Sequence, residues 1–212
     1  MFVKVCGITR LEDAKAAYHL GFSAVGFIFV PESPRYIPPD RARLISHRLP
    51  TGLLRVGVVA GMARDEVRHL FRFCKLDLVQ FHGGEGPDEV APFAPRAIKA
   101  LRPTREEDLD EAEGFPPLFA FLVDAWSSRS LGGTGRTADW SLAARLAKHR
   151  RVILAGGLRE ENVLAALKAV RPFGLDVNSG VERAPGIKDG ELMARFISRA
   201  KESELFSKYK EA

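Results

Sequence analysis

The chain has 212 residues, of which 46% are hydrophobic and 28% charged. This length and composition suit one domain with a sizeable core and exclude collagen-like and disordered classes. The formal net charge of +5 is spread along the chain without a dense Lys/Arg run. That distribution argues against nucleic-acid binding and favours a small anionic substrate.

The chain start and the two cysteines bear on the cellular compartment. No apolar run approaches the ~20 residues of a membrane span, and the segment Met1–Cys6 lacks the features of a signal peptide. We therefore expect a cytoplasmic protein without membrane contact. Cys6 and Cys74 are not expected to form a disulfide there. Cys74 lies in an apolar helical pattern and is interpreted as a packed structural residue.

Apolar, β-branched runs alternate with segments of helical periodicity. Eight strands are predicted, at Phe2–Ile8, Ala24–Val30, Leu54–Ala60, Leu78–His82, Ala97–Leu101, Leu118–Val123, Val152–Ala155 and Gly174–Val177. Helices are predicted between and after them, at Leu11–Leu20, Asp40–Leu49, Arg64–Phe73, Glu85–Phe93, Arg105–Glu113, Asp139–His149, Glu160–Val170 and Asp189–Ala200. Eight strand-then-helix units predict an α/β fold, a single (β/α)8 barrel domain over residues 1–212.

Local signals at the helix starts and loops refine this prediction. Thr9 with Glu12, and Thr104 with Glu107, have the spacing of a capping box. Two long loops, 31–39 and 125–138, follow the second and sixth predicted strands, which places them at the active face of a barrel. The second is polar and Gly-rich, and a lid is the expected function of such a loop. An open doubly wound sheet fits less well, because no Gly-x-Gly-x-x-Gly turn follows the first strand.

A cysteine and an aspartate stand at the ends of two predicted strands. Cys6 lies at the end of the first and Asp124 follows the sixth, so both are expected at the barrel mouth. A thiolate can act as a base where positive charge lowers the thiol pKa. A carboxyl group between apolar walls favours its protonated form and can donate a proton. The alternatives are a packed cysteine and a loop-anchoring aspartate. Lys4 shares a strand face with Cys6, as a helper or as a structural ion-pair partner.

Glycine-rich segments follow the seventh and eighth predicted strands. They contain four candidate phosphate-binding residues, Gly156, Gly157, Ser179 and Gly180. The loops after these two strands often bind phosphate in such barrels, because glycine lets backbone N–H groups approach the anion. Glycines that merely permit tight turns are the alternative, but two such segments at the expected strand ends favour a phosphate site.

Two further residues are candidates for substrate contact. Arg35 lies in a loop stiffened by prolines and can bind a carboxylate with two hydrogen bonds, or it is an ordinary surface arginine. His82 ends the fourth predicted strand, as a donor to the ligand or as a core histidine. No second histidine or carboxylate stands at ligand spacing, so no metal is predicted.

These residues predict a cofactor-independent barrel enzyme that isomerises a small sugar phosphate. A non-catalytic phosphate-binding barrel is the alternative from another class, and it would need no pair such as Cys6 and Asp124. The sequence leaves the oligomeric state open, with a homodimer as one possibility.

Six motifs, in this order, closely resemble the phosphoribosylanthranilate isomerase family of tryptophan biosynthesis: Lys4–Thr9, Ser33–Arg35, Gln80–Gly83, Gly132–Gly135, Leu154–Leu158 and Asp176–Glu182. The resemblance extends from Val3 to about Asp189. Two residues depart from the usual family pattern, Asn178 in place of Ser and Phe81 in place of Leu. Asn can still form hydrogen bonds, and Phe81 is expected to change packing more than chemistry, so we expect the acid–base pair to be unaffected.

The resemblance implies an Amadori rearrangement of N-(5′-phosphoribosyl)anthranilate to 1-(2-carboxyphenylamino)-1-deoxyribulose 5-phosphate, without a cofactor. It implies that Cys6 is the general base, Asp124 the general acid and Arg35 the residue that binds the anthranilate carboxylate. It places His82 and Asp176 near the substrate and the four glycine-segment residues around its phosphate. A histidine-pathway aminoaldose isomerase would instead have Asp in place of Cys6, and a pentose-phosphate epimerase would need metal ligands on several strands.

Overall fold

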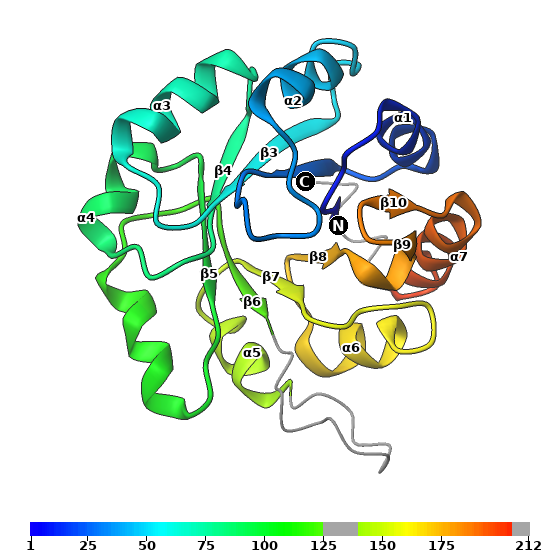
Figure 1. The fold of residues 1–212 in the computed structure, drawn as a ribbon. Helices are drawn as coiled ribbons and strands as arrows, with labels where there is room; N and C mark the ends of the chain where they lie inside the picture. The colour runs from blue at the N-terminus through cyan, green and yellow to red at the C-terminus, as the bar shows by residue number, and fades with distance from the viewer. Residues whose placement is uncertain (125–139, 205–212) are drawn as a thin grey trace.

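Eight parallel strands close into a barrel in the computed structural model, which describes residues 1–124 and 140–204 (Figure 1). The strands are β1 (Phe2–Val5), β2 (Ala24–Ile28), β3 (Leu54–Val59), β4 (Leu78–Phe81), β5 (Ala97–Leu101), β6 (Ala120–Asp124), β7 (Val152–Ala155) and β8 (Gly174–Val177). Each strand pairs with the next, and β8 pairs with β1 to close the barrel. The predicted (β/α)8 fold is confirmed, with three strands matching their predicted bounds and the others differing by three residues or fewer at an end.

Helices form a ring around the barrel (Figure 1). They are α1 (Leu11–Leu20), α2 (Pro39–Ser46), α3 (Arg64–Phe73), α4 (Pro87–Val90), α5 (Ser141–Leu146), α6 (Val163–Val170) and α7 (Gly190–Lys201). The prediction of a helix after β5 needs correction, because η2 (Glu106–Gly114) is a 3₁₀ helix. Its apolar residues Leu109 and Ala112, followed by Phe115, recur every three residues, which is the 3₁₀ period.

The predicted capping boxes are wrong in detail. The Thr9 hydroxyl donates a hydrogen bond to the Gly186 carbonyl at 2.5 Å, and no side chain caps α1. Thr104 bonds to Asp108 rather than to Glu107, with its hydroxyl 2.9 Å from the carboxylate. For Thr9, a contact with a distant segment replaces the local hydrogen bond. For Thr104, the 3₁₀ geometry of η2 brings Asp108 rather than Glu107 within reach of the hydroxyl.

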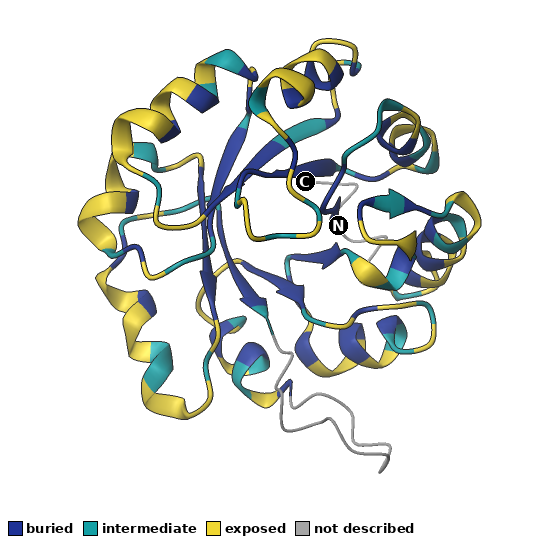
Figure 2. Cartoon of the chain, viewed as in Figure 1, coloured by how far each residue is buried: buried dark blue, intermediate teal, exposed yellow. Residues whose placement is uncertain are grey.

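Alternating strand residues divide the core into two layers. The outer layer packs between the barrel and the helices, and the inner layer fills the barrel with residues such as Ile98, Leu122 and Ile153. Figure 2 shows the buried strands inside helices whose outer faces are exposed. On β1, Phe2 lies in the inner layer, whereas Val3 and Val5 belong to the outer layer. The side chains that alternate with Val3 and Val5 therefore face the barrel interior.

Aromatic rings close the amino-terminal end of the barrel. Phe2, Phe119 and Phe173 stand at or just before the starts of their strands, and their ring centroids lie 5.4, 5.8 and 5.9 Å apart. Cys74 is fully buried against α2, with its thiol 3.5 Å from the Pro39 carbonyl oxygen, which confirms its structural interpretation.

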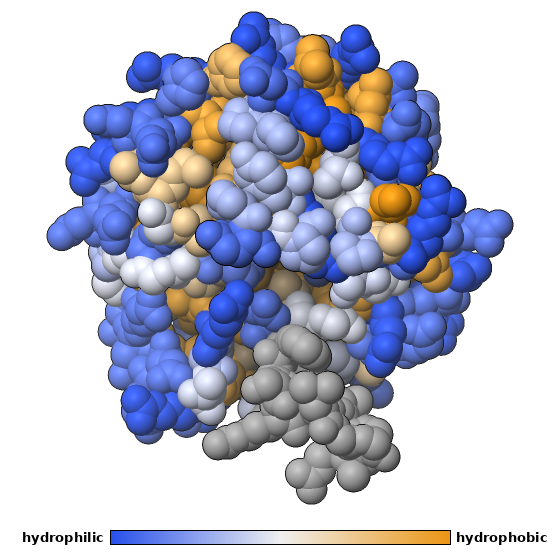
Figure 3. Space-filling model, viewed as in Figure 1, coloured by the Kyte–Doolittle hydropathy of each residue, from blue (hydrophilic) through white to orange (hydrophobic). Residues whose placement is uncertain are grey.

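A short antiparallel hairpin that the periodicity did not predict follows β8. It consists of β9 (Glu182–Ala184) and β10 (Ile187–Lys188), preceded by the 3₁₀ turn η4 (Ser179–Val181). Hydrophilic side chains dominate the rim of the face in Figure 3. Across the described ranges, no helix combines the length and the apolar character needed to cross a membrane.

Candidate active site

A cavity of about 1010 Å³ opens at the carboxyl ends of the strands. All nine residues that the sequence singled out as candidate site residues line it: Cys6, Arg35, His82, Asp124, Gly156, Gly157, Asp176, Ser179 and Gly180. The fold thus brings the candidate acid, base, carboxylate receptor and phosphate loops to one mouth. The predicted lid loop, 125–138, lies outside the described residues.

Cys6 lies just beyond β1 and faces the barrel interior. Its backbone N–H donates to the Val177 carbonyl at 2.9 Å, which fixes it against β8, and the residue is only 4% exposed. A Cβ atom on Gly26 would lie 2.8 Å from the Cys6 sulfur and 3.2 Å from the Lys4 ammonium. The absent side chain at Gly26 therefore makes room for the thiol and the ammonium group side by side.

The protonation of Cys6 differs from the sequence-based expectation. Burial raises the pKa of the Cys6 thiol above its ordinary value, and the positive charges of Lys4 and Lys188 oppose this rise only in part. The expected lowering of the thiol pKa by a positive environment is therefore wrong, because the loss of water around the sulfur outweighs the nearby cations.

Lys4 and Asp176 form a buried ion pair beneath Cys6. They are direct register partners on β1 and β8, and the Lys4 Nζ lies 2.9 Å from the Asp176 Oδ2. Burial alone would lower the pKa of Lys4, but the adjacent carboxylate outweighs it and raises that pKa. Both roles left open for Lys4 are thus combined, since it pairs with Asp176 and also lies beside the Cys6 thiol.

Asp124 ends β6 across the mouth from Cys6. Its side chain is 25% exposed, and its carboxylate lies 3.9 Å from the Nε of Arg102. Its surroundings are therefore more polar than the apolar walls that the sequence suggested. The register pair between Asp124 and Ala155 places the carboxyl group next to the start of the glycine segment after β7.

His82 follows β4 and contacts Gln80. The Gln80 amide nitrogen lies 2.8 Å from the His82 Nδ1. Burial, together with the nearby Arg102 charge, lowers the pKa of His82 to about 4. The ring is consequently neutral near pH 7. In this orientation of the Gln80 amide its nitrogen donates and Nδ1 accepts, which corresponds to the tautomer with the ring proton on Nε2.

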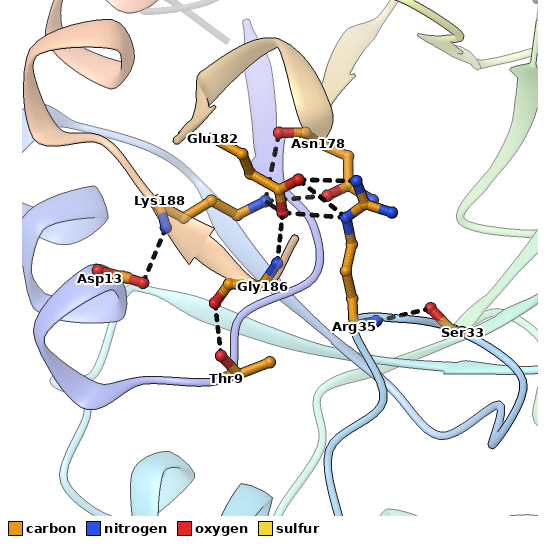
Figure 4. Close-up of polar contacts among 8 residues, drawn as sticks. All are labelled: Thr9, Asp13, Ser33, Arg35, Asn178, Glu182, Gly186 and Lys188. Carbon is orange, nitrogen blue, oxygen red and sulfur yellow. Dashed lines mark hydrogen bonds and ion pairs between the residues drawn. The ribbon is translucent and has the colours of Figure 1, made fainter. Parts of the chain in front are cut away.

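Arg35 is held by a carboxylate that the sequence analysis gave no role. Its Nη2 and Nε donate to Glu182 at 2.7 and 3.0 Å, and Glu182 in turn accepts from the Lys188 Nζ at 2.8 Å (Figure 4). Gly7, with φ +73°, lies beneath this arrangement, and a Cβ there would come within 2.8 Å of the Arg35 Cδ. Arg35 is therefore fixed at the cavity rather than free in solvent, which excludes its interpretation as a surface arginine.

Backbone contacts bring the two glycine segments together. Gly156 and Gly157 adopt positive φ angles of 89° and 63°. A Cβ on Gly180 would lie 2.0 Å from the Leu158 carbonyl oxygen, so only glycine permits this approach. Asn162 stabilises the first segment, since its amide donates to the Gly157 carbonyl at 2.9 Å.

Several cavity or network residues were missed as individual sites. Glu182 was visible only as a member of a motif and Lys188 only within the span of the resemblance, and their network depends on the β9–β10 hairpin. Gln80 was likewise visible only as a member of a motif, and Arg102 carried no signal beyond its proximity to a strand end. Asn178 forms a hydrogen bond, since its side-chain oxygen accepts from the Lys188 Nζ at 2.9 Å, and Phe81 packs against Phe93. Among the residues described, no His, Cys, Asp or Glu cluster could hold a metal ion.

Comparison with known proteins gives a consistent family assignment. Residues 3–199 match the family described as N-(5′-phosphoribosyl)anthranilate (PRA) isomerase. A relative from Rubrobacter xylanophilus, named N-(5′-phosphoribosyl)anthranilate isomerase, is 46% identical over 202 residues, covering 94% of this chain and 98% of the relative.

Two solved structures extend the comparison to the fold. The phosphoribosyl anthranilate isomerase of Thermotoga maritima is 41% identical, with a TM-score of 0.86 over 96% of this chain and all of that one. A phosphoribosyl anthranilate isomerase in complex with reduced 1-(o-carboxyphenylamino)-1-deoxyribulose 5-phosphate is 39% identical, with a TM-score of 0.83 over the same shares. The chain therefore belongs to the N-(5′-phosphoribosyl)anthranilate isomerase family of tryptophan biosynthesis.

Proposed function

We propose that the chain performs the family's rearrangement by acid–base catalysis without a cofactor, with Asp124 as the acid and Cys6 as the base. The observation that carries this proposal is the convergence of a thiol and a carboxyl group from β1 and β6 on one cavity. Acid and base must be separate groups, because one acts on the ring oxygen of the ribose and the other on C2′.

Binding at both ends of the substrate would orient the sugar between these groups. The phosphate would lie against the backbone of Gly156, Gly157 and Gly180 with the Ser179 hydroxyl nearby, where positive-φ glycines leave N–H groups accessible. The anthranilate carboxylate would lie on Arg35. Orientation of this kind lowers the barrier by reducing the entropy that is lost during the reaction.

The chemistry then proceeds in two proton transfers. The Asp124 carboxylic acid gives its proton to the furanose ring oxygen as the C1′–O bond breaks, and the anthranilate nitrogen forms a Schiff base with C1′. The Cys6 thiolate removes the proton from C2′, and the C–H electron pair forms the C1′–C2′ double bond of an enolamine. Tautomerisation of the enolamine gives the ketone. Each transfer contributes about 10²–10⁴-fold to the rate.

Lys4, His82 and Asp176 support these steps. The Lys4 ammonium beside the sulfur stabilises the thiolate against the cost of burial, and Asp176 holds Lys4 in place. Neutral His82 can donate a hydrogen bond to the substrate from Nε2 in the tautomer in which Nδ1 accepts from Gln80. Because burial raises the thiol pKa, we expect kcat/KM to rise with pH above neutrality.

Steady-state turnover of freshly generated phosphoribosylanthranilate, followed by the decay of its fluorescence without added metal, tests the proposal. Cys6→Ala and Asp124→Asn are each expected to lower kcat about 10²–10⁴-fold while inorganic phosphate still competes with substrate. Near-wild-type kcat in either variant would remove that residue from its role. No turnover by the wild type would refute the activity itself and favour a non-catalytic phosphate-binding barrel.

A further inference from the structure

The Arg35 guanidinium is held on one side only. Its Nε and Nη2 are both bonded to Glu182, whereas Nη1 has no hydrogen-bond partner among the residues described (Figure 4). Arg35 lines the cavity. A free guanidinium would sample many rotamers, so the clamp preselects an orientation in which Nη1 remains available to a ligand.

Glu182 and Lys188 are charged residues whose side chains are almost completely buried. Their side chains are 4% and 0% exposed, and the Lys188 Nζ also bonds to the Asn178 side-chain oxygen at 2.9 Å. The backbone N–H of Lys188 donates to Asp13 at 3.0 Å, which ties the hairpin to α1. Buried charges of this kind are costly to place, and each needs its partner, because removing one leaves the other uncompensated.

The three side chains that meet at Glu182 leave one positive charge for an anionic ligand, whereas Asp13 bonds to the backbone N–H of Lys188. Arg35 and Glu182 alone would form a neutral pair with little attraction for an anion. Lys188 brings the net charge of these three side chains to +1, and it does not itself line the cavity. Burial would raise the pKa of Glu182, but the hydrogen bonds from Arg35 and Lys188 outweigh it and lower that pKa, so the carboxylate remains charged near neutrality.

We propose that Glu182 and Lys188 are positioning residues for the carboxylate end of the substrate: Glu182 aims Arg35, and Lys188 offsets the charge of Glu182. The inference rests on the proposed role of Arg35 in binding the anthranilate carboxylate. It makes the C-terminal hairpin, rather than the Arg35 loop alone, the part of the chain that sets preference for an aromatic acid over the corresponding uncharged aromatic amine.

Two inhibitors separate this role from general structural damage. One is reduced 1-(o-carboxyphenylamino)-1-deoxyribulose 5-phosphate, and the other is its counterpart lacking the carboxyl group. The ratio of their inhibition constants measures carboxylate preference independently of turnover. Arg35→Met should abolish the preference and set the lower limit. Glu182→Gln and Lys188→Met should each reduce it about tenfold, since a charge-assisted hydrogen bond contributes about that much.

The two variants test different halves of the proposal. Glu182→Gln raises the net charge of the network but replaces one of the two acceptor oxygens with an amide donor, which weakens the hold on Arg35. A loss of preference therefore supports aiming, and an increase would overturn it. Lys188→Met leaves a neutral Arg35–Glu182 pair, so full preference in that variant would overturn the charge argument. Glu32→Gln, the same chemical change at an exposed position in the Arg35 loop, should leave the ratio unchanged.

Further outcomes distinguish failure of the inference from failure of the proposed function. Equal weakening of both inhibitors in Glu182→Gln would indicate a merely structural role and overturn the inference. Wild-type preference that survives Arg35→Met would refute the proposed role of Arg35 itself. Where Glu182→Gln does not fold, Glu182→Asp retains the charge and shortens the reach, and a smaller loss of the same ratio is then expected.

Discussion

The two ends of the barrel are built from opposite kinds of residue. At the amino-terminal end, Phe2, Phe119 and Phe173 pack ring against ring. At the carboxyl end, Cys6 and Arg35 face a cavity lined with polar groups. In such barrels the amino-terminal end contributes to stability through its packing, whereas the carboxyl end holds the polar groups of the active site and is packed less completely. Along β1 and the residue after it, the inward-facing side chains change from the aromatic ring of Phe2 through the ammonium group of Lys4 to the thiol of Cys6.

The Lys4–Asp176 pair occupies the boundary between these two ends, so its removal has the largest expected effect. Lys4→Met leaves the buried Asp176 carboxylate without its partner at 2.9 Å. We expect the free energy of unfolding to fall by about 3–5 kcal/mol, because an uncompensated buried charge is costly. Urea unfolding followed by circular dichroism measures this directly.

A paired control separates lost charge from lost volume. The double variant Lys4→Met/Asp176→Leu removes both charges, and we expect it to recover much of the lost stability. Both variants should lose turnover, because the cation beside Cys6 is gone. A Lys4→Met variant within about 1 kcal/mol of the wild type would show that the boundary between the two ends does not depend on this pair.

The polar end of the barrel is also expected to make stability depend on pH, through His82. The pKa of His82 is about 4 in the folded protein, below its ordinary value of 6.5. Between these two values the unfolded chain binds a proton that the folded chain does not, so stability falls as the pH drops from about 6.5 towards 4. We expect His82 to account for a loss of about 2 kcal/mol between pH 7 and pH 4.5.

The contribution of His82 appears as a difference between proteins. Urea unfolding of the wild type and of His82→Asn across this range should show a shallower decline for the variant. His149→Asn, at an exposed position, should behave as the wild type does. Parallel declines of stability with pH in all three proteins would show that His82 does not cause the decline, and would contradict a lowered pKa of His82 in the folded protein.

The barrel and the candidate residues that line its cavity could be predicted from the sequence more fully than the contacts around them. Strand bounds followed from apolar runs, and strand order placed Cys6 and Asp124 at one mouth. The position of Arg35 against Glu182 could not be predicted, because it depends on a hairpin of three and two residues that periodicity cannot detect. Such contacts join segments that are distant in sequence, and no local pattern encodes them.

The effect of the electrostatic environment on the pKa of a buried group could not be predicted from the sequence either. The thiol of Cys6 was expected to gain acidity from nearby positive charge, and two ammonium groups do lie near it. The balance is nevertheless decided by burial, which is a property of the complete fold. Likewise, Thr9 has a capping partner at the right spacing, yet it bonds to Gly186 from a different part of the chain.

The division between the two ends is tested most directly by measuring unfolding free energy and kcat side by side for Cys6→Ala and Phe2→Ala. We expect Cys6→Ala to lose about 10²–10⁴-fold in kcat with a stability change of no more than about 1 kcal/mol. Phe2→Ala should lose about 3 kcal/mol of stability while each folded molecule retains wild-type kcat. An active Cys6→Ala variant, or a stable but inactive Phe2→Ala variant, would contradict the account.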